Sequence, residues 1–434
     1  MHRWDYSSGH SPVVKLQAAL CLVCRRLYPI ALPYLYADLF TQSYLYQSSY
    51  LDRKEKAEKS LKLVHGSLKR NPAVWPFCRR LLVHYSEYDN TGEGEDRNPF
   101  AFLVADYLTW FTELRSLFFR GVRQERAWEL VRRALENCPS LSELVLTSSG
   151  DYQLDLARVV DMLSEVPCPQ LRVLGVEGIS RQHGRLMSQK LQEKAGTATF
   201  STLRTSSFLQ LPSVLEDLVR WPKTLEELQI EHTFSACYSY IGLFDNWSLA
   251  TLQPIFAIHK STLRRIAVRC INRGGLAGFD LRGFPRLEEL KLSSASTTSR
   301  WGQYGAEYQF LPNLFAPRLR VFHWDLTLED QQCQEQLSDF SQEEEGFLRE
   351  FASTGLRCKA SLREIRITFT PETYVHATDE LYPWDRMDAL DREFKEKGIR
   401  VRYNPPSISR DKFLSNQERA REGARVEADA EVDS

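Results

Sequence analysis

One short phrase recurs along the chain and limits the folds it can adopt. The phrase reads Leu-x-x-Leu-x-Leu, with Ile, Val, Phe or Trp also present at the later apolar positions. Its copies are "TELRSLFF", "PSLSELVL", "PQLRVLGV", "KTLEELQI", "STLRRIAV", "PRLEELKL", "PRLRVFHW" and "ASLREIRI", with "FCRRLLV" as a weaker member. In each copy the last two apolar residues alternate with polar ones, which indicates a short strand with one buried face. The first Leu is expected to cover the turn before that strand.

Segments with helical periodicity precede several of these phrases. "QERAWELVRRALEN" places Trp128, Val131 and Leu135 along one face, and "LDLARVVDMLSEV" and "SVLEDLVRW" follow the same pattern. Each segment runs into a proline, which stops a helix and pushes the preceding residue into an extended conformation. The chain therefore repeats the order helix, proline, strand.

No single copy can bury its own apolar face, so neighbouring copies must stack. The pattern resembles the leucine-rich-repeat family in an irregular, helix-backed form, because the spacing is uneven and often longer than about 20–29 residues. The resemblance covers residues 75–404 and implies an α/β solenoid with parallel strands on the concave side and helices outside. An α/β enzyme whose parallel strands happen to begin with Leu is the alternative.

The polar positions within the strands are candidates for binding a protein partner. If the strands form one wall, these positions make a continuous strip of mixed charge, which suits a protein of complementary charge. His323 lies at an outward strand position beside Asp325, and we interpret it as an ordinary polar strand residue; the alternative is that the carboxylate of Asp325 raises the histidine pKa. The candidates are Phe118, Arg120, Glu177, Gln229, Glu231, Arg269, Lys291, His323, Asp325 and Arg366.

The segment "LQAALCLVCRRLYPIALPYLYADLF" raises three possibilities near the start of the chain. Its apolar run is far shorter than the ~20 residues that cross a bilayer, which excludes a membrane span. Cys21 and Cys24 have no second Cys pair or His at ligand spacing, so we interpret them as small buried side chains rather than a zinc or redox site. A helical docking module is the reading that remains.

The same segment resembles the second half of an F-box, the module that docks substrate receptors onto a ubiquitin ligase. The match runs through Leu20, Val23, Cys24, Arg25, Arg26, Leu27, Tyr28, Leu32, Pro33, Leu35 and Tyr36. The family's preceding Leu-Pro-x-Glu helix has no counterpart, so the resemblance is to a partial module. It implies binding to a Skp-type adaptor and a cullin scaffold. The residues implied to contact the adaptor are Leu20, Val23, Cys24 and Leu27.

We therefore predict four parts: a partial F-box-like module at 1–45, a linking helix at 46–74, the solenoid at 75–404 and a charged, disordered tail at 405–434. The tail has almost no large apolar residues. The acidic turn in "SQEEEGFLRE" is interpreted as a solvated helix face.

Composition and motifs narrow the function. A net charge of −1 gives no global attraction to nucleic acid or to an anionic membrane. An odd count of nine cysteines favours a reducing compartment, cytoplasm or nucleus. No catalytic, nucleotide-binding or metal-binding motif is present, so we predict no enzyme activity, cofactor or metal. The resemblance to F-box proteins with leucine-rich repeats implies the substrate-recognition subunit of a cullin-based (SCF-type) ubiquitin ligase with an unknown target protein. A protein-binding scaffold without ligase docking is the alternative.

Overall fold

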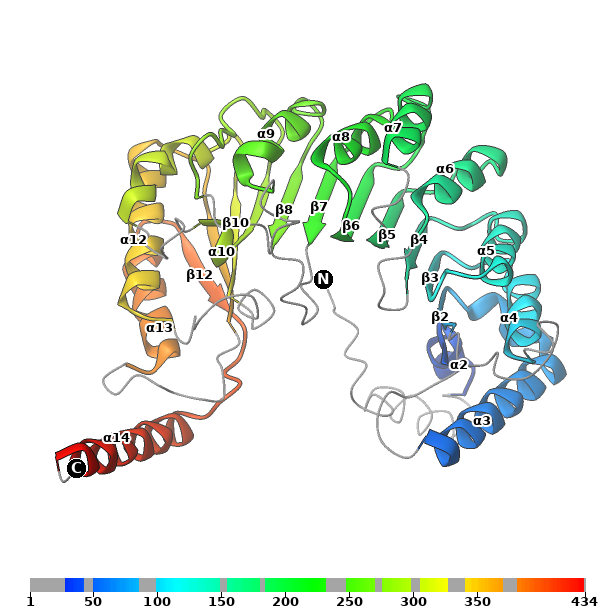
Figure 1. The fold of residues 1–434 in the computed structure, drawn as a ribbon, viewed down its shortest axis with the longest axis horizontal. Coiled ribbons are helices and arrows are strands. Elements are labelled where there is room, and N and C mark those ends of the chain that lie inside the picture. Colours follow the sequence, from blue (N-terminus) through cyan, green and yellow to red (C-terminus); the bar gives the residue numbers. More distant parts are fainter. Residues whose placement is uncertain are drawn as a thin grey trace. The chain divides into compact units, whose positions relative to one another are not determined.

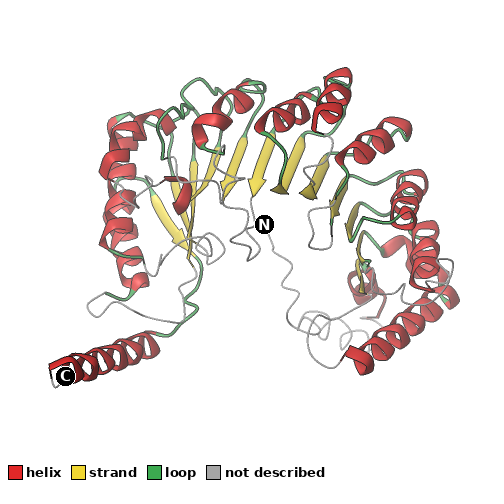
Figure 2. Cartoon of the chain, in the orientation of Figure 1, coloured by secondary structure: helices red, strands yellow, loops and turns green. Residues whose placement is uncertain are grey.

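The computed structural model describes residues 28–42, 50–85, 99–148, 154–179, 184–231, 247–269, 275–297, 305–326, 340–369 and 381–432. The chain forms two compact units, Met1–Phe200 and Ser201–Ser434. Strands alternate with helices in both, and most helices of each unit lie along one face of its sheet (Figure 1, Figure 2). This is the predicted α/β architecture of a leucine-rich-repeat solenoid.

In the first unit, five parallel strands pair in chain order. Its elements are α2 (Tyr28–Tyr36), β1 (Asp38–Gln42), α3 (Tyr50–Arg70), the 3-10 helix η1 (Pro72–Phe77), β2 (Arg80–His84), α4 (Pro99–Trp110), β3 (Ser116–Arg120), α5 (Glu125–Asn137), β4 (Glu143–Thr147), α6 (Leu156–Glu165), β5 (Val173–Ile179) and α7 (Gly184–Glu193).

In the second unit, seven parallel strands also pair in chain order. Its elements are β6 (Thr202–Phe208), α8 (Pro212–Arg220), β7 (Glu227–Glu231), α9 (Leu249–Ala257), β8 (Arg265–Arg269), β9 (Glu289–Ser293), α10 (Ser294–Thr297), the 3-10 helix η5 (Gly305–Leu314), β10 (Val321–Leu326), α12 (Gln342–Arg357), β11 (Glu364–Phe369), α13 (Pro383–Lys395), β12 (Arg400–Tyr403) and α14 (Arg410–Val432).

The recurring phrase performs two structural tasks. Its two strand residues point toward the helices, and its first Leu closes the turn below them; Leu225, Leu263 and Leu287, for example, are fully buried. A main-chain contact then fixes the register between copies. At the start of β8 the amides of Arg264 and Arg265 both donate to the carbonyl of Glu226, at 2.8 and 3.0 Å, and the same pattern recurs from copy to copy. Each copy thus satisfies the polar backbone of the next one.

The structure differs from the predicted part boundaries at both ends. Strand β1 lies within the segment assigned to the helical module and pairs with β2, so within the described part of the chain the sheet begins at Asp38 rather than near residue 75. At the other end, the segment predicted to be disordered forms α14. Phe413 is buried and packs edge-on against Tyr382, with ring centroids 5.5 Å apart. Arg410 adds an ion pair of 2.8 Å to Asp385. Phe413 and Arg410 thus anchor the start of a helix whose composition is mostly polar.

Candidate functional site

The candidate site is the face of the β6–β12 sheet that lies opposite the helices, which we call the front face. Strand residues alternate between the two faces, so the front-face side chains fall into three rows that run across the strands. The start row is Thr202, Glu227, Arg265, Glu289, Val321, Glu364 and Arg400; the middle row is Arg204, Gln229, Ala267, Lys291, His323, Arg366 and Arg402; the end row is Ser206, Glu231, Arg269, Ser293, Asp325 and Thr368.

The predicted site residues of this unit all lie in the middle and end rows. The strand register aligns Gln229, Lys291, His323 and Arg366 in the middle row. Glu231, Arg269 and Asp325 belong to the end row. Sequence reasoning missed the charged members of the start row, together with Arg204 and Arg402. The signal was present, because the residue before the second Leu of each phrase is often Glu or Arg.

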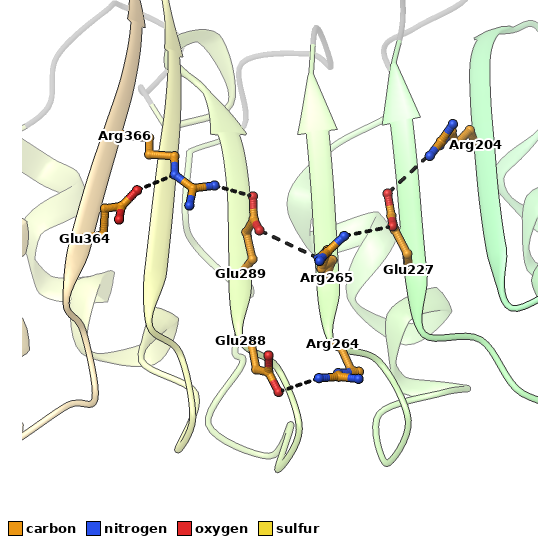
Figure 3. A network of polar contacts seen from close by, with 8 residues as sticks. All are labelled: Arg204, Glu227, Arg264, Arg265, Glu288, Glu289, Glu364 and Arg366. Atoms are coloured by element: carbon orange, nitrogen blue, oxygen red, sulfur yellow. Dashed lines mark hydrogen bonds and ion pairs between the residues drawn. The ribbon is translucent and has the colours of Figure 1, made fainter. Parts of the chain in front are cut away.

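Ion pairs link the start and middle rows into a chain that crosses the strands (Figure 3). Arg366 contacts Glu364 on its own strand and Glu289 two strands away, the latter at 3.5 Å. Arg265 on β8 lies between Glu289 and Glu227, at 3.7 and 3.5 Å. Each base therefore contacts one or two acids on the same or a nearby strand, which holds its long side chain in a defined position.

A second cluster surrounds Asp325, whose side chain is only 2% exposed. Its carboxylate lies 2.7 Å from the ammonium group of Lys291 and 3.1 Å from Nε of Arg269. Arg269 also contacts Glu231 at 3.5 Å, so it reaches across β9 to join two acids. Burial opposes ionisation of Asp325, but the two cations outweigh it, and the pKa of this carboxyl lies below its ordinary value.

The surroundings of His323 exclude the alternative of a raised pKa. Burial, followed by the charge of Lys291, lowers the pKa of His323 to about 4. The carboxylate of Asp325 raises this pKa too little to compensate, because it is already paired with Lys291 and Arg269. The neutral imidazole instead contacts the Thr368 hydroxyl, with Nε2 and Oγ1 2.7 Å apart.

The first unit presents a different front face. Its middle row is Phe40, Leu82, Phe118, Val145 and Gly175, which is apolar where the second unit is basic. The predicted residues Arg120 and Glu177 lie in the next row, which also contains His84. Burial and the neighbouring Arg120 lower the pKa of His84 to about 4. Phe118, Arg120 and Glu177 are thus placed on one face of the first unit's sheet.

The residues predicted to contact an adaptor, Leu20, Val23, Cys24 and Leu27, lie outside the described residues. The later part of the F-box-like run forms α2, which contacts η1 and β1. Only Ala37 separates α2 from β1. The run is therefore continuous with the first strand of the sheet.

Helix α3 is fixed to the first repeats by a group of aromatic rings. The indoles of Trp75 and Trp110 stack with their centroids 4.8 Å apart, and His65 stacks on Trp110 at 5.0 Å. His65 Nε2 also lies 2.7 Å from the carboxylate of Asp106. The Trp75 indole N–H donates to the Leu68 carbonyl at 2.9 Å. These contacts join α3, η1 and α4 into one packed body.

Two further observations concern function. No group of three His, Cys, Asp or Glu side chains in the described part of the chain could hold a metal ion. Among the helices that the structure describes, none has both the length and the apolar character needed to cross a membrane.

Comparisons with known proteins found no matching family model and no matching curated protein. Among solved structures, the chain is similar to one in the crystal structure of the Rad7 and Elc1 complex in yeast. The sequence identity is 15%, the match covers 74% of this chain and 83% of that chain, and the TM-score is 0.36. The fold described above rests on the strand register and helix placement of this chain itself.

Proposed function

We propose that this protein is the substrate-recognition subunit of a cullin-based (SCF-type) ubiquitin ligase, acting in the cytoplasm or nucleus. It would perform no chemistry itself. It would hold a target protein on its repeat surface so that the transfer enzyme of the ligase meets a lysine at high local concentration. The observation that carries this proposal is the front face of β6–β12, where ordered rows of charged side chains cross parallel strands.

Such a face suits protein recognition because its side chains are already positioned. Arg366, for example, is held between Glu364 and Glu289, so a partner does not have to order it on binding. Charged rows also discriminate between partners, since a mismatched charge is penalised more strongly than a matched one is rewarded.

The N-terminal segment supports the ligase part of the proposal. The F-box-like run from Leu20 to Tyr36 would supply the adaptor contact, and α2 leads into β1 after a single residue. Together with the α3–η1–α4 packing, this attaches the part of the run that forms α2 to the first repeats. A receptor needs such an attachment because a loose connection would dilute the local concentration of the target.

The test is co-purification of the full chain with a Skp-type adaptor and a cullin. We expect the wild type to retain both, and a Val23→Glu, Leu27→Glu double variant to lose both while its circular dichroism spectrum is unchanged. Leu63→Glu is the matched control, since Leu63 is a 63% exposed apolar residue on α3 and its replacement should leave adaptor binding intact.

Two results would contradict the proposal in different ways. If the wild type retains neither adaptor nor cullin, the ligase role is wrong. If a target protein binds but its turnover is the same for wild type and the Val23→Glu, Leu27→Glu variant, the chain is a binding scaffold without ligase docking.

A further inference from the structure

The front face presents bases to solvent and keeps its acids beneath them. Arg402 is 69% exposed, whereas Glu364, which lies 3.7 Å from it, is 17% exposed. Arg366 is 42% exposed against the same Glu364, and Lys291 is 21% exposed against 2% for Asp325. Of the ion pairs described on this face, Arg269–Glu231 is the one in which the acid is more exposed than the base. The surface is therefore basic even though the charges are nearly balanced.

The middle row concentrates this effect. It carries Arg204, Lys291, Arg366 and Arg402 and contains no acid. The last three lie on β9, β11 and β12, and the residue between them on β10 is His323. Because its pKa is lowered to about 4, His323 is neutral at pH 7. It therefore neither repels Lys291 and Arg366 nor neutralises their positive charge.

We infer that the β9–β12 part of the front face binds an extended acidic segment of the target protein, aligned along the middle row. This inference names the chemistry of the target and rests on the proposed function. Carboxylate or phosphate groups of the segment would pair with Lys291, Arg366 and Arg402. Guanidinium groups suit both anions because they donate two parallel hydrogen bonds.

The dimensions agree with an extended peptide. Strands lie about 4.8 Å apart, so the row from β9 to β12 is roughly 14 Å long. An extended chain advances about 3.3 Å per residue and returns a side chain to the same side every second residue, roughly 6.7 Å further on. Five or so residues would thus carry two or three acidic side chains over the three cations.

A nucleic acid is the less suitable partner. Its phosphates form a continuous line of negative charge. Phosphates that spread beyond the middle row would be repelled by the carboxylates of the two flanking rows, which include Glu227, Glu231, Glu289 and Glu364. An acidic peptide can place its charges at alternate residues and put neutral ones against the acids.

The experiment measures fluorescence anisotropy of labelled peptides, roughly ten residues long, with the full chain. One peptide has Asp at alternate positions, a second has Asn instead, and a third has phosphoserine in place of Asp. An oligothymidine of the same net charge is the fourth probe. We expect the Asp and phosphoserine peptides to bind more tightly than both the Asn peptide and the oligothymidine. The difference in affinity between the Asp and phosphoserine peptides shows whether the row prefers carboxylate or phosphate.

The variant for this test is Arg366→Gln with Arg402→Gln. Each lost cation should weaken acidic peptide binding about fivefold and reduce its dependence on salt. Arg349→Gln with Arg357→Gln is the matched control. These two α12 arginines are 44% and 66% exposed, close to the 42% of Arg366 and the 69% of Arg402, but they lie on the helix side of the sheet. Denaturation midpoints of both double variants verify that they fold.

The inference is wrong if Asn and Asp peptides bind equally, if both double variants bind alike, or if the oligothymidine binds more tightly than the acidic peptides. Adaptor co-purification is measured on the same preparations. If adaptor and cullin are retained while the acidic peptides fail to bind, the proposed function stands and only the acidic segment is refuted.

Discussion

Replacing Asp325 by Asn tests whether the end-row cluster is held together by one buried charge. Asn has nearly the same shape but carries no charge, so the change leaves Lys291 and Arg269 facing each other without their shared anion. These cations are 21% and 12% exposed and cannot turn fully into water. The variant therefore isolates the electrostatic contribution of the carboxylate.

The expected cost follows from the two contacts. A charge-assisted contact contributes about 1.5–3 kcal/mol, and removing one member of a buried pair costs about 3–5 kcal/mol. Since the cations keep some access to water, we expect the lower end, about 3 kcal/mol. For a unit of the size of Ser201–Ser434, this corresponds to a midpoint lowered by roughly 6–12 °C.

The assay is thermal and urea denaturation followed by far-ultraviolet circular dichroism, with Asp280→Asn as the control. Asp280 is a 42% exposed carboxylate paired only locally with Arg282, so its replacement should cost no more than about 0.5 kcal/mol. The pKa of Asp325 is lowered, so its contribution is complete above the unfolded value of about 3.9 and is lost as the pH falls further. Equal midpoints for the two variants at pH 7 would refute this account of the cluster.

Three further predictions use other positions. The pKa of His323 is about 4 in the folded chain and about 6.5 in the unfolded chain, so protonation favours unfolding between these pH values. The wild type should therefore lose stability as the pH falls from 6.5 to 4, and His323→Gln should remove about 3 kcal/mol of that loss. Urea denaturation midpoints of both proteins at the two pH values measure the difference. Phe413→Ala should undock α14 without unfolding the sheet, and hydrogen exchange of the α14 amides should accelerate at least tenfold. Gly121→Ala should lower the first unit's melting midpoint, because φ is +92° and a Cβ would lie 1.9 Å from a backbone oxygen, whereas Gly66→Ala, with open space, should not.

The strands could be predicted where the apolar pattern is strong. All nine quoted phrases coincide with strands, β2–β5 and β7–β11. The strands β1, β6 and β12 were not recognised. Strand β6, "TLRTSSF", has Leu203 and Phe208 as its apolar residues, and β12 has four residues in all. Such segments become strands because a neighbouring strand offers its backbone groups, as when the Arg400 amide donates to the Arg363 carbonyl at 2.9 Å.

The acidic turn at the start of α12 shows a signal that was present but misinterpreted. The sequence predicted a solvated face, whereas Glu344 is buried and forms a capping box with Ser341. The spacing Ser-x-x-Glu is typical of this motif, which satisfies two backbone amides at a helix start. The run of acidic residues alone suggested a solvent-exposed face, whereas the Ser-x-x-Glu spacing indicates that Glu344 caps the start of the helix.

The placement of charges on the front face could be predicted only in part. Alternation along each strand identified which residues share the face, because it depends on backbone geometry alone. The partners of each charge could not be predicted, since Arg269 reaches Asp325 across an intervening strand. Such contacts depend on the strand order and on how far each side chain extends.

Side-chain length explains why a nearly balanced face presents bases. On parallel strands all side chains leave the sheet from the same height, and Arg and Lys extend further than Asp and Glu. When they pair, the acid lies near the backbone and the base lies over it, as with Glu364 beneath Arg366 and Arg402. Arg269 is the exception because it extends sideways to Asp325 and so stays low. The formal charge of a row thus matters less to a partner than the depth at which each charge lies, and above Glu364 and Asp325 a partner meets guanidinium and ammonium groups before it meets the carboxylate.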